Sequence, residues 1–256
     1  MPQTSSKGGD DPTMAAKKYR NEIKLRLTEE EYRILSARIA AVLAPDSNMG
    51  EEGYRISSLY FDDLQRSALY EKLAGAPDRK KYRIRIYNGS DAFIRLECKE
   101  KNRGKICKRS VRIDRTVYEQ MLRGETEALS AIDHPLARET VALMRANGLA
   151  PSVIVNYIRE AYVHPLSTTR ITFDRKLSVP INTLDLFAEA DERLVFPQDD
   201  TILEIKYDTH LPRYIADLLQ CRSVPVAASK FVLCTDYLDD RHIRILPNSI
   251  DKGEAL

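Results

Sequence analysis

The chain has 256 residues, 43% of them hydrophobic and 30% charged, which is enough for a substantial hydrophobic core in one large domain or two small ones. Its net charge is only +2, so a uniformly basic nucleic-acid coat is excluded, and any positive charge that serves a function must be concentrated locally. No run of residues reaches the length of a membrane span and the polar start lacks the apolar core of a signal peptide, so we expect a cytoplasmic protein without a membrane segment in this chain.

The chain is predicted to form one domain with a short tail at each end. Residues 1–16 are rich in Ser, Gly, Asp and Pro and are expected to be disordered, residues 17–240 form the domain, and residues 241–256 form a C-terminal tail. Neither the four cysteines, which form no CxxC pair, nor the four histidines, which share no HxxxH spacing, indicate a metal site.

Strands and helices alternate along the domain. Alternation of apolar with polar or charged residues predicts strands at 19–27, 54–61, 152–162, 168–177 and 201–207. Thr28 with Glu31 forms a capping box for a helix that Pro45 ends, and Asp62-Asp63 can cap a short helix to about residue 74. Further helices are predicted at 117–132, 135–147, 212–221 and 229–237, with Gly148 as a helix stop.

The most unusual stretch runs from residue 81 to residue 112 and holds eleven Lys or Arg against three acids. Arg83, Arg85 and Tyr87 share one strand face, and after the Asn88-Gly89 turn a second charged face carries Arg95, Glu97, Lys99 and Lys101. Like charges on paired strands repel, so such a sheet requires either open solvent above that face or a polyanion.

About eight strands are predicted, and six of them carry charge on one face. The apolar faces must be covered by helices, which predicts an α+β protein built on an antiparallel sheet. Closing the sheet with its charged face inward gives an eight-stranded β-barrel around a wet tunnel, with the helices packed outside. An open sheet with one solvated face fits the alternation equally well, and only the repetition of charge from strand to strand favours closure.

Nine segments in order resemble a known family: YRNEIKL, SLYFDD, KYRIRIYN, IRLECKEK, KICKR, NYIREAY, TRITFDRKL, LEIKYD and SKF. They resemble the polyphosphate polymerase domain of the vacuolar transporter chaperone (VTC) complex, which belongs to the CYTH-like triphosphate tunnel metalloenzymes. The resemblance extends from about Lys18 to Tyr237. It implies a basic tunnel that holds a triphosphate, with a divalent cation, Mn²⁺ or Mg²⁺, on a glutamate.

The resemblance also implies roles for individual residues. The expected catalytic set is Arg83, Arg85, Lys99, Arg159, Arg170 and Lys230. The expected phosphate-binding set is Lys24, Arg95, Lys101, Lys105, Lys108, Lys206 and Ser229, where either Lys105 or Lys108 faces the tunnel. Glu204 matches the metal-binding glutamate, and Glu22, Glu97 and Asp174 are further candidate metal ligands.

Three functions compete at this point. The first is transfer of the γ-phosphoryl group of ATP to phosphate or polyphosphate, for which a cationic tunnel removes the repulsion between two anions. The second is a metal-dependent hydrolase of the same fold that acts on inorganic triphosphate or nucleoside triphosphates. The third is a non-catalytic polyanion-binding module. ATP and phosphate chains are the expected partners, nucleic acid is not, and a membrane partner that takes up the product stays open. A P-loop or Rossmann site is excluded because the sequence has no GxxxxGK[ST] and no GxGxxG that opens a helix.

Overall fold

The computed structural model describes residues 21–103, 105–196, 200–223, 225 and 229–245. One antiparallel sheet organises them, with eight strands in the order β1-β10-β8-β7-β3-β4-β5-β6, while β2 pairs with β7 and β9 with β8. The strands are β1 (Asn21–Leu27), β2 (Ala44–Pro45), β3 (Tyr54–Asp62), β4 (Arg79–Tyr87), β5 (Ser90–Asn102), β6 (Lys105–Ile113), β7 (Ala150–Val163), β8 (Arg170–Pro180), β9 (Glu192–Leu194) and β10 (Thr201–Tyr207). The predicted disordered tail at 1–16 and the C-terminal tail beyond residue 245 lie outside the described residues.

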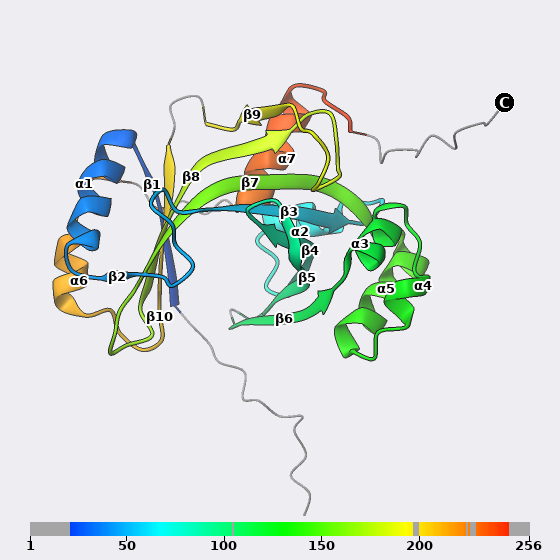
Figure 1. Ribbon diagram of the computed structural model, residues 1–256, viewed down its shortest axis with the longest axis horizontal. Coiled ribbons are helices and arrows are strands. Elements are labelled where there is room, and N and C mark those ends of the chain that lie inside the picture. The colour runs from blue at the N-terminus through cyan, green and yellow to red at the C-terminus, as the bar shows by residue number, and fades with distance from the viewer. Residues whose placement is uncertain (1–20, 104, 197–199, 224, 226–228, 246–256) are drawn as a thin grey trace, which may run out of the picture.

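The predicted α+β class with an antiparallel sheet is confirmed, and the sheet curves around a central space (Figure 1). β1 and β6 stand at the two ends of the strand order, and within the described residues no backbone pairing joins them. Side chains bridge part of this gap instead, since Lys99 of β5 lies 3.5 Å from Glu22 of β1. The sheet is therefore barrel-like without a complete ring of strand hydrogen bonds.

Two groups of helices cover the outer face of the sheet (Figure 1). The helices α1 (Glu29–Ala40) and α6 (Arg213–Leu218) pack on β1, β10 and β8. The helices α3 (Arg115–Leu122), α4 (Glu127–Ser130) and α5 (Pro135–Asn147) pack on β3, β4 and β5. This is the covering that the apolar strand faces predict.

The remaining helices, α2 (Ser67–Leu73) and α7 (Lys230–Asp240), contribute to a third apolar cluster on the inner face. Phe231 and Val232 of α7 join Val153 and Val155 of β7 there, on the same strand face as Arg159. The sequence did not predict that a helix enters the charged side of the sheet. The inner face is thus apolar at one end and charged beside it.

Local signals placed most element boundaries correctly. The Thr28–Glu31 capping box is present, and Asn88 and Gly89 both have positive φ values of 51° and 67°, as a two-residue hairpin turn of this type requires. The single helix predicted at 117–132 was wrong, because the chain turns at Gly124 with φ of 81° and divides it into α3 and α4. Among the described residues, no helix combines the length and apolar character needed to cross a membrane.

Candidate active site

A cavity of about 350 Å³ opens on the inner face of the sheet, and we call it the basic cavity. Its described lining contains eleven Lys or Arg side chains and two carboxylates. The lining residues are Glu22, Lys24, Tyr60, Lys72, Arg79, Lys81, Arg83, Arg85, Lys99, Lys101, Ile106, Tyr157, Arg159, Glu204, Lys206, Ser229, Lys230 and Phe231. So high a density of positive charge in a partly enclosed space favours a polyanionic ligand.

Strand alternation accounts for most of this lining. Arg83 and Arg85 on β4 face inward while Tyr82, Ile84 and Ile86 enter the outer core. On β10, Glu204 and Lys206 face inward, whereas Leu203 and Ile205 pack under α1 and α6. The period of two residues therefore carries charged side chains from five strands of the sheet, β1, β4, β5, β7 and β10, into one space.

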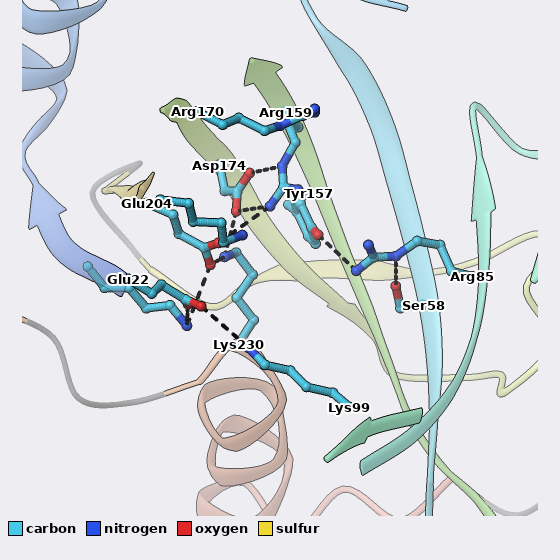
Figure 2. Close-up of polar contacts among 12 residues, drawn as sticks. Glu22, Ser58, Arg85, Lys99, Tyr157, Arg159, Arg170, Asp174, Glu204 and Lys230 are labelled. Carbon is cyan, nitrogen blue, oxygen red and sulfur yellow. Dashed lines mark hydrogen bonds and ion pairs between the residues drawn. The ribbon is translucent and has the colours of Figure 1, made fainter. Parts of the chain in front are cut away.

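Glu204 lies at the centre of the charge network (Figure 2). Its carboxylate is 2.8 Å from the Nζ of Lys206 and of Lys230. Lys24 and Arg159 lie farther off, at 3.7 and 3.9 Å. Burial opposes ionisation of Glu204, but these surrounding cations hold the pKa of the carboxyl well below its usual value.

Asp174 on β8 is enclosed by two of the same cations. Arg159 binds it with two hydrogen bonds, 2.6 and 2.7 Å long, and Lys230 lies 2.5 Å from its Oδ2. Burial raises the pKa of Asp174 and the two cations lower it, with the net shift downward. Both carboxylate oxygens are therefore occupied by protein cations.

Two further carboxylates, Glu22 on β1 and Glu97 on β5, pair with other cations of the charge network. Glu22 lies 2.6 Å from Lys24 and 3.5 Å from Lys99, and despite burial these lysines lower its pKa to about 2. Glu97, which is only 1% exposed, lies 2.7 Å from Arg83 and 2.5 Å from Lys108. Burial again opposes ionisation, but Arg83, Arg85 and Lys108 bring the pKa of Glu97 to about 2.

Hydrogen bonds hold Arg83 and Arg85 of β4 in place, which a solvated strand face would not require. Arg85 donates to Ser58 Oγ at 3.1 Å and to Tyr157 Oη at 3.3 Å, and Arg83 donates to Tyr60 Oη at 2.8 Å (Figure 2 shows the Arg85 contacts). Arg85 is 7% exposed. A solvated charged face does not describe this strand, because the hydrogen bonds fix both guanidinium groups in place.

The described residues contain no group of three or more His, Cys, Asp or Glu placed to hold a metal ion. Mg²⁺ commonly takes one or two carboxylates and completes its coordination with substrate phosphates and water. Glu204 fits that pattern, and Glu22 lies close enough to Glu204 that repulsion between the two carboxylates opposes part of the lowering of the Glu22 pKa. The donor set therefore suits a cation that arrives with phosphate oxygens and does not suit a resident metal held by protein alone.

Three of the predicted catalytic and phosphate-binding residues lie apart from the described lining of the basic cavity. Arg170 pairs with Asp46 at 2.6 Å and donates to Tyr54, and Arg95 stacks over Phe93 at 4.5 Å. Lys108 reaches the network only through Glu97 and is 46% exposed. The side chain of Lys105 lies outside the described part of the structure. The other predicted catalytic and phosphate-binding residues line the cavity together.

Seven lining residues were not among the sequence candidates, and five of these have polar or charged side chains: Tyr60, Lys72, Arg79, Lys81 and Tyr157. Arg79 and Lys81 precede Arg83 at steps of two on β4, so extending the alternation toward the start of that strand would have found them. Lys72 comes from α2, and strand periodicity gives no signal for a residue on a packed helix.

Comparison with solved structures gives distant likenesses. A candidate adenylyl cyclase of Hippeastrum, described as having a dominant triphosphatase activity, is 16% identical, with 91% of this chain and 92% of that chain covered and a TM-score of 0.45. A candidate adenylate cyclase of Bacillus halodurans is 10% identical, with 92% and 96% covered and a TM-score of 0.47. A protein of Pyrococcus horikoshii is 12% identical, with 78% and 84% covered and a TM-score of 0.38. Likenesses this distant assign no activity to the chain.

The sequence itself gives the decisive comparison. A search of curated proteins found no significant match. The family model described as the VTC domain matches residues 19–238, which span every strand of the sheet and every residue of the basic cavity. The chain therefore belongs to the VTC domain family.

Proposed function

We propose that this protein is a phosphotransferase that moves the γ-phosphoryl group of ATP to inorganic phosphate or to the end of a polyphosphate chain inside the basic cavity. The observation that carries the proposal is the excess of cations over carboxylates in one partly enclosed space. Membership in the VTC domain family supports the same assignment.

The chemistry requires little beyond position and charge. The P–O bond between the γ-phosphorus and the bridging oxygen of ATP breaks, a new P–O bond forms to a terminal oxygen of the acceptor, and ADP leaves with the electron pair. The acceptor oxygen is already ionised near neutral pH, so no catalytic base is needed. The main obstacle is repulsion between two anions, which fixed cations offset.

Arg85 and Arg83 are suited to hold the transferred phosphoryl group. Their planar guanidinium groups can bind two phosphate oxygens at once, and hydrogen bonds to Ser58 and Tyr157 hold Arg85 in one orientation before a ligand enters. Such preorganisation lowers the cost of reaching the transition state. Arg159 lines the same cavity, and its two hydrogen bonds to Asp174 fix the orientation of its guanidinium group.

Lys24, Lys206 and Lys230 are suited to exchange partners when a triphosphate binds. In the structure they share Glu204, and a phosphate chain would offer them additional oxygens. Glu204 would hold Mn²⁺ or Mg²⁺, which would neutralise part of the charge of the bound triphosphate. Glu22 of β1 is the other carboxylate in the described lining.

The carboxylates that hydrolysis would need are poor bases. A hydrolase must orient and partly deprotonate water, and a general base works best when its pKa is near the working pH. Glu22 and Glu97 have pKa values of about 2 and are engaged by lysines and arginines. This observation favours transfer to an ionised phosphate over transfer to water.

The test is to incubate the pure protein with ATP and Mn²⁺ and to separate the products on a gel. Long phosphate chains together with ADP are expected. ADP and free phosphate without chains would contradict the proposal and support the hydrolase, and binding of phosphate chains without turnover in any metal would support the polyanion-binding module. Arg85→Lys should abolish most turnover because it keeps the charge and loses the fork, whereas Arg109→Lys, on the outer face beside Glu139, should not.

A further inference from the structure

A second cavity, of about 260 Å³, lies on the outer face of the sheet, and we call it the outer pocket. Ser57 on β3 and Asn156 on β7 line it. The residues that follow them, Ser58 and Tyr157, point the other way and donate or accept in the contacts that hold Arg85. The outer pocket and the basic cavity therefore lie on opposite faces of the same two strands, and their described linings share no residue.

The connection between β8 and β9, residues 181–191, forms the other side of the outer pocket and contributes five of its described lining residues. A backbone hydrogen bond of 2.9 Å from Ile181 N to Asp191 O closes this loop at its base. Tyr118 of α3 anchors its middle, because the hydroxyl donates to Asp185 Oδ1 and accepts from a backbone N–H of the loop, both at 2.7 Å. The domain thus holds the loop over the sheet.

Asn156 is a buried polar residue with an unmet hydrogen bond. Its side chain lies in a row with Ser57 and Ser178 across three strands, whereas elsewhere on the outer face helices cover apolar side chains. Asn156 is only 3% exposed, and among the described residues its Oδ1 has no hydrogen-bond partner. Buried amide oxygens are nearly always paired, so a donor from outside the chain is expected at this oxygen.

The charge of the outer pocket is opposite in sign to that of the basic cavity. Its described lining has three charged side chains, of which Arg55 pairs with Glu192, while Ser178 donates to the second oxygen of Glu192 at 2.8 Å. Asp185 accepts from the hydroxyl of Tyr118 and from a backbone N–H, and the ion pairs of the described residues include none with it. One negative charge stays unpaired, which disfavours phosphate compounds here.

We propose that the outer pocket binds a small primary amine in its ammonium form, with the ammonium group donating to Asn156 Oδ1. An ammonium group has three donors and no acceptor, and it supplies the positive charge that Asp185 lacks. The alkyl part packs against Ile154, Leu186 and Phe187, which line the same space. This site goes beyond the proposed function, because it shares no described lining residue with the basic cavity.

The size of the outer pocket limits the ligand. Its volume of about 260 Å³ is far above the roughly 10–15 Å³ that one ordered water requires. It is also slightly below the range of about 300–1,000 Å³ that is usual for pockets of drug-sized ligands. An amine with a short carbon chain therefore fits the space better than a single water or a large cofactor.

The experiment titrates the full chain with three probes that share a four-carbon chain and differ in the head group: butylammonium, butanol and butyrate. Binding is followed at pH 7 by ligand-observed NMR, without metal or nucleotide. We expect saturable binding of butylammonium. Butanol donates one hydrogen bond but brings no charge, so it should bind about tenfold more weakly or less, and butyrate should not bind.

Two variants locate the binding. Asn156→Leu keeps nearly the same size and removes the unpartnered oxygen, so it should stay folded and weaken butylammonium binding by about tenfold or more. The matched control is Thr201→Val, which removes another buried oxygen without a partner among the described residues, outside the outer pocket, and should leave the affinity unchanged. The three-probe comparison on the unaltered protein stands even if Asn156→Leu does not fold.

The opposite results would overturn the proposal. No saturable binding of butylammonium would mean that Asn156 bonds only to water. Equal affinities for butanol and butylammonium would make the outer pocket a site for neutral donors. Full affinity in Asn156→Leu, or an equal loss in Thr201→Val, would place the bound amine elsewhere on the protein. Because no nucleotide is present, none of these results depends on the outcome of the polymerase assay.

Discussion

Arg159 and Asp174 lie directly opposite each other on β7 and β8, joined by two hydrogen bonds of 2.6 and 2.7 Å. Lys230, the first residue of α7, contacts the same carboxylate at 2.5 Å (Figure 2). Asp174 is fully buried. One carboxylate thus orients a candidate catalytic arginine and ties the inner helix to the sheet, which assigns Asp174 a positioning role in the cavity wall.

Asp174→Asn should destabilise the protein severely. It removes the charge that compensates Arg159 and Lys230, and leaving buried charges unpaired costs about 3–5 kcal/mol. Asp46→Asn is the matched control, because its partner Arg170 is 33% exposed and partly exposed pairs contribute about 0–1 kcal/mol. The measurement is the free energy of unfolding in urea, and equal losses in the two variants would contradict the role assigned to Asp174.

Glu204→Gln should separate metal use from chain binding. Loss of the carboxylate removes the proposed cation ligand, so the Mn²⁺ concentration for half-maximal turnover should rise by about tenfold or more. The same change frees Lys206 and Lys230 from their shared partner, so metal-free affinity for polyphosphate should stay equal or increase. Glu100→Gln, a carboxylate on the outer face, is the control. An unchanged metal requirement would remove Glu204 from the proposed metal site.

The sequence predicted the charged face well because alternation depends only on the period of a strand. Arg83, Arg85, Glu97 and Lys99 lie on the faces expected, and the Asn88-Gly89 turn sets the hairpin between them. It did not reveal that Glu97 is buried beneath three cations, since burial of a charge depends on what closes over it. The alternative of an open sheet with a solvated charged face does not hold for this reason.

The position of α7 could not be read from its own residues. Phe231 and Val232 give the helix an apolar stripe, but a stripe does not say which face of a sheet it will cover. The helix packs on the inner face because Val153 and Val155 make one end of that face apolar. Strand β9 is three residues long and β2 only two, too short for alternation to register, so both were missed.

Glu139 on α5 should make stability depend on acid pH without involving the basic cavity. Tyr82 and Lys80 donate to its Oε1 and Arg109 to its Oε2, and although burial opposes ionisation these partners lower the pKa of Glu139 to about 2. The unfolded chain binds this proton at a higher pH, so the contribution is full above pH 4.5 and is lost as pH falls toward 2.

Glu139→Gln should therefore lower the free energy of unfolding by roughly 1–2 kcal/mol at pH 7, a modest amount because Glu139 is partly exposed and its ion pairs are screened. Near pH 2 the loss should be much smaller, because Glu139 is then protonated in the wild-type protein. The measurement is the free energy of unfolding across this range. Glu125→Gln, an exposed carboxylate paired only with Arg123, should be nearly neutral at both pH values. A cost for Glu139→Gln that stays constant from pH 7 to pH 2 would contradict the ionised pair.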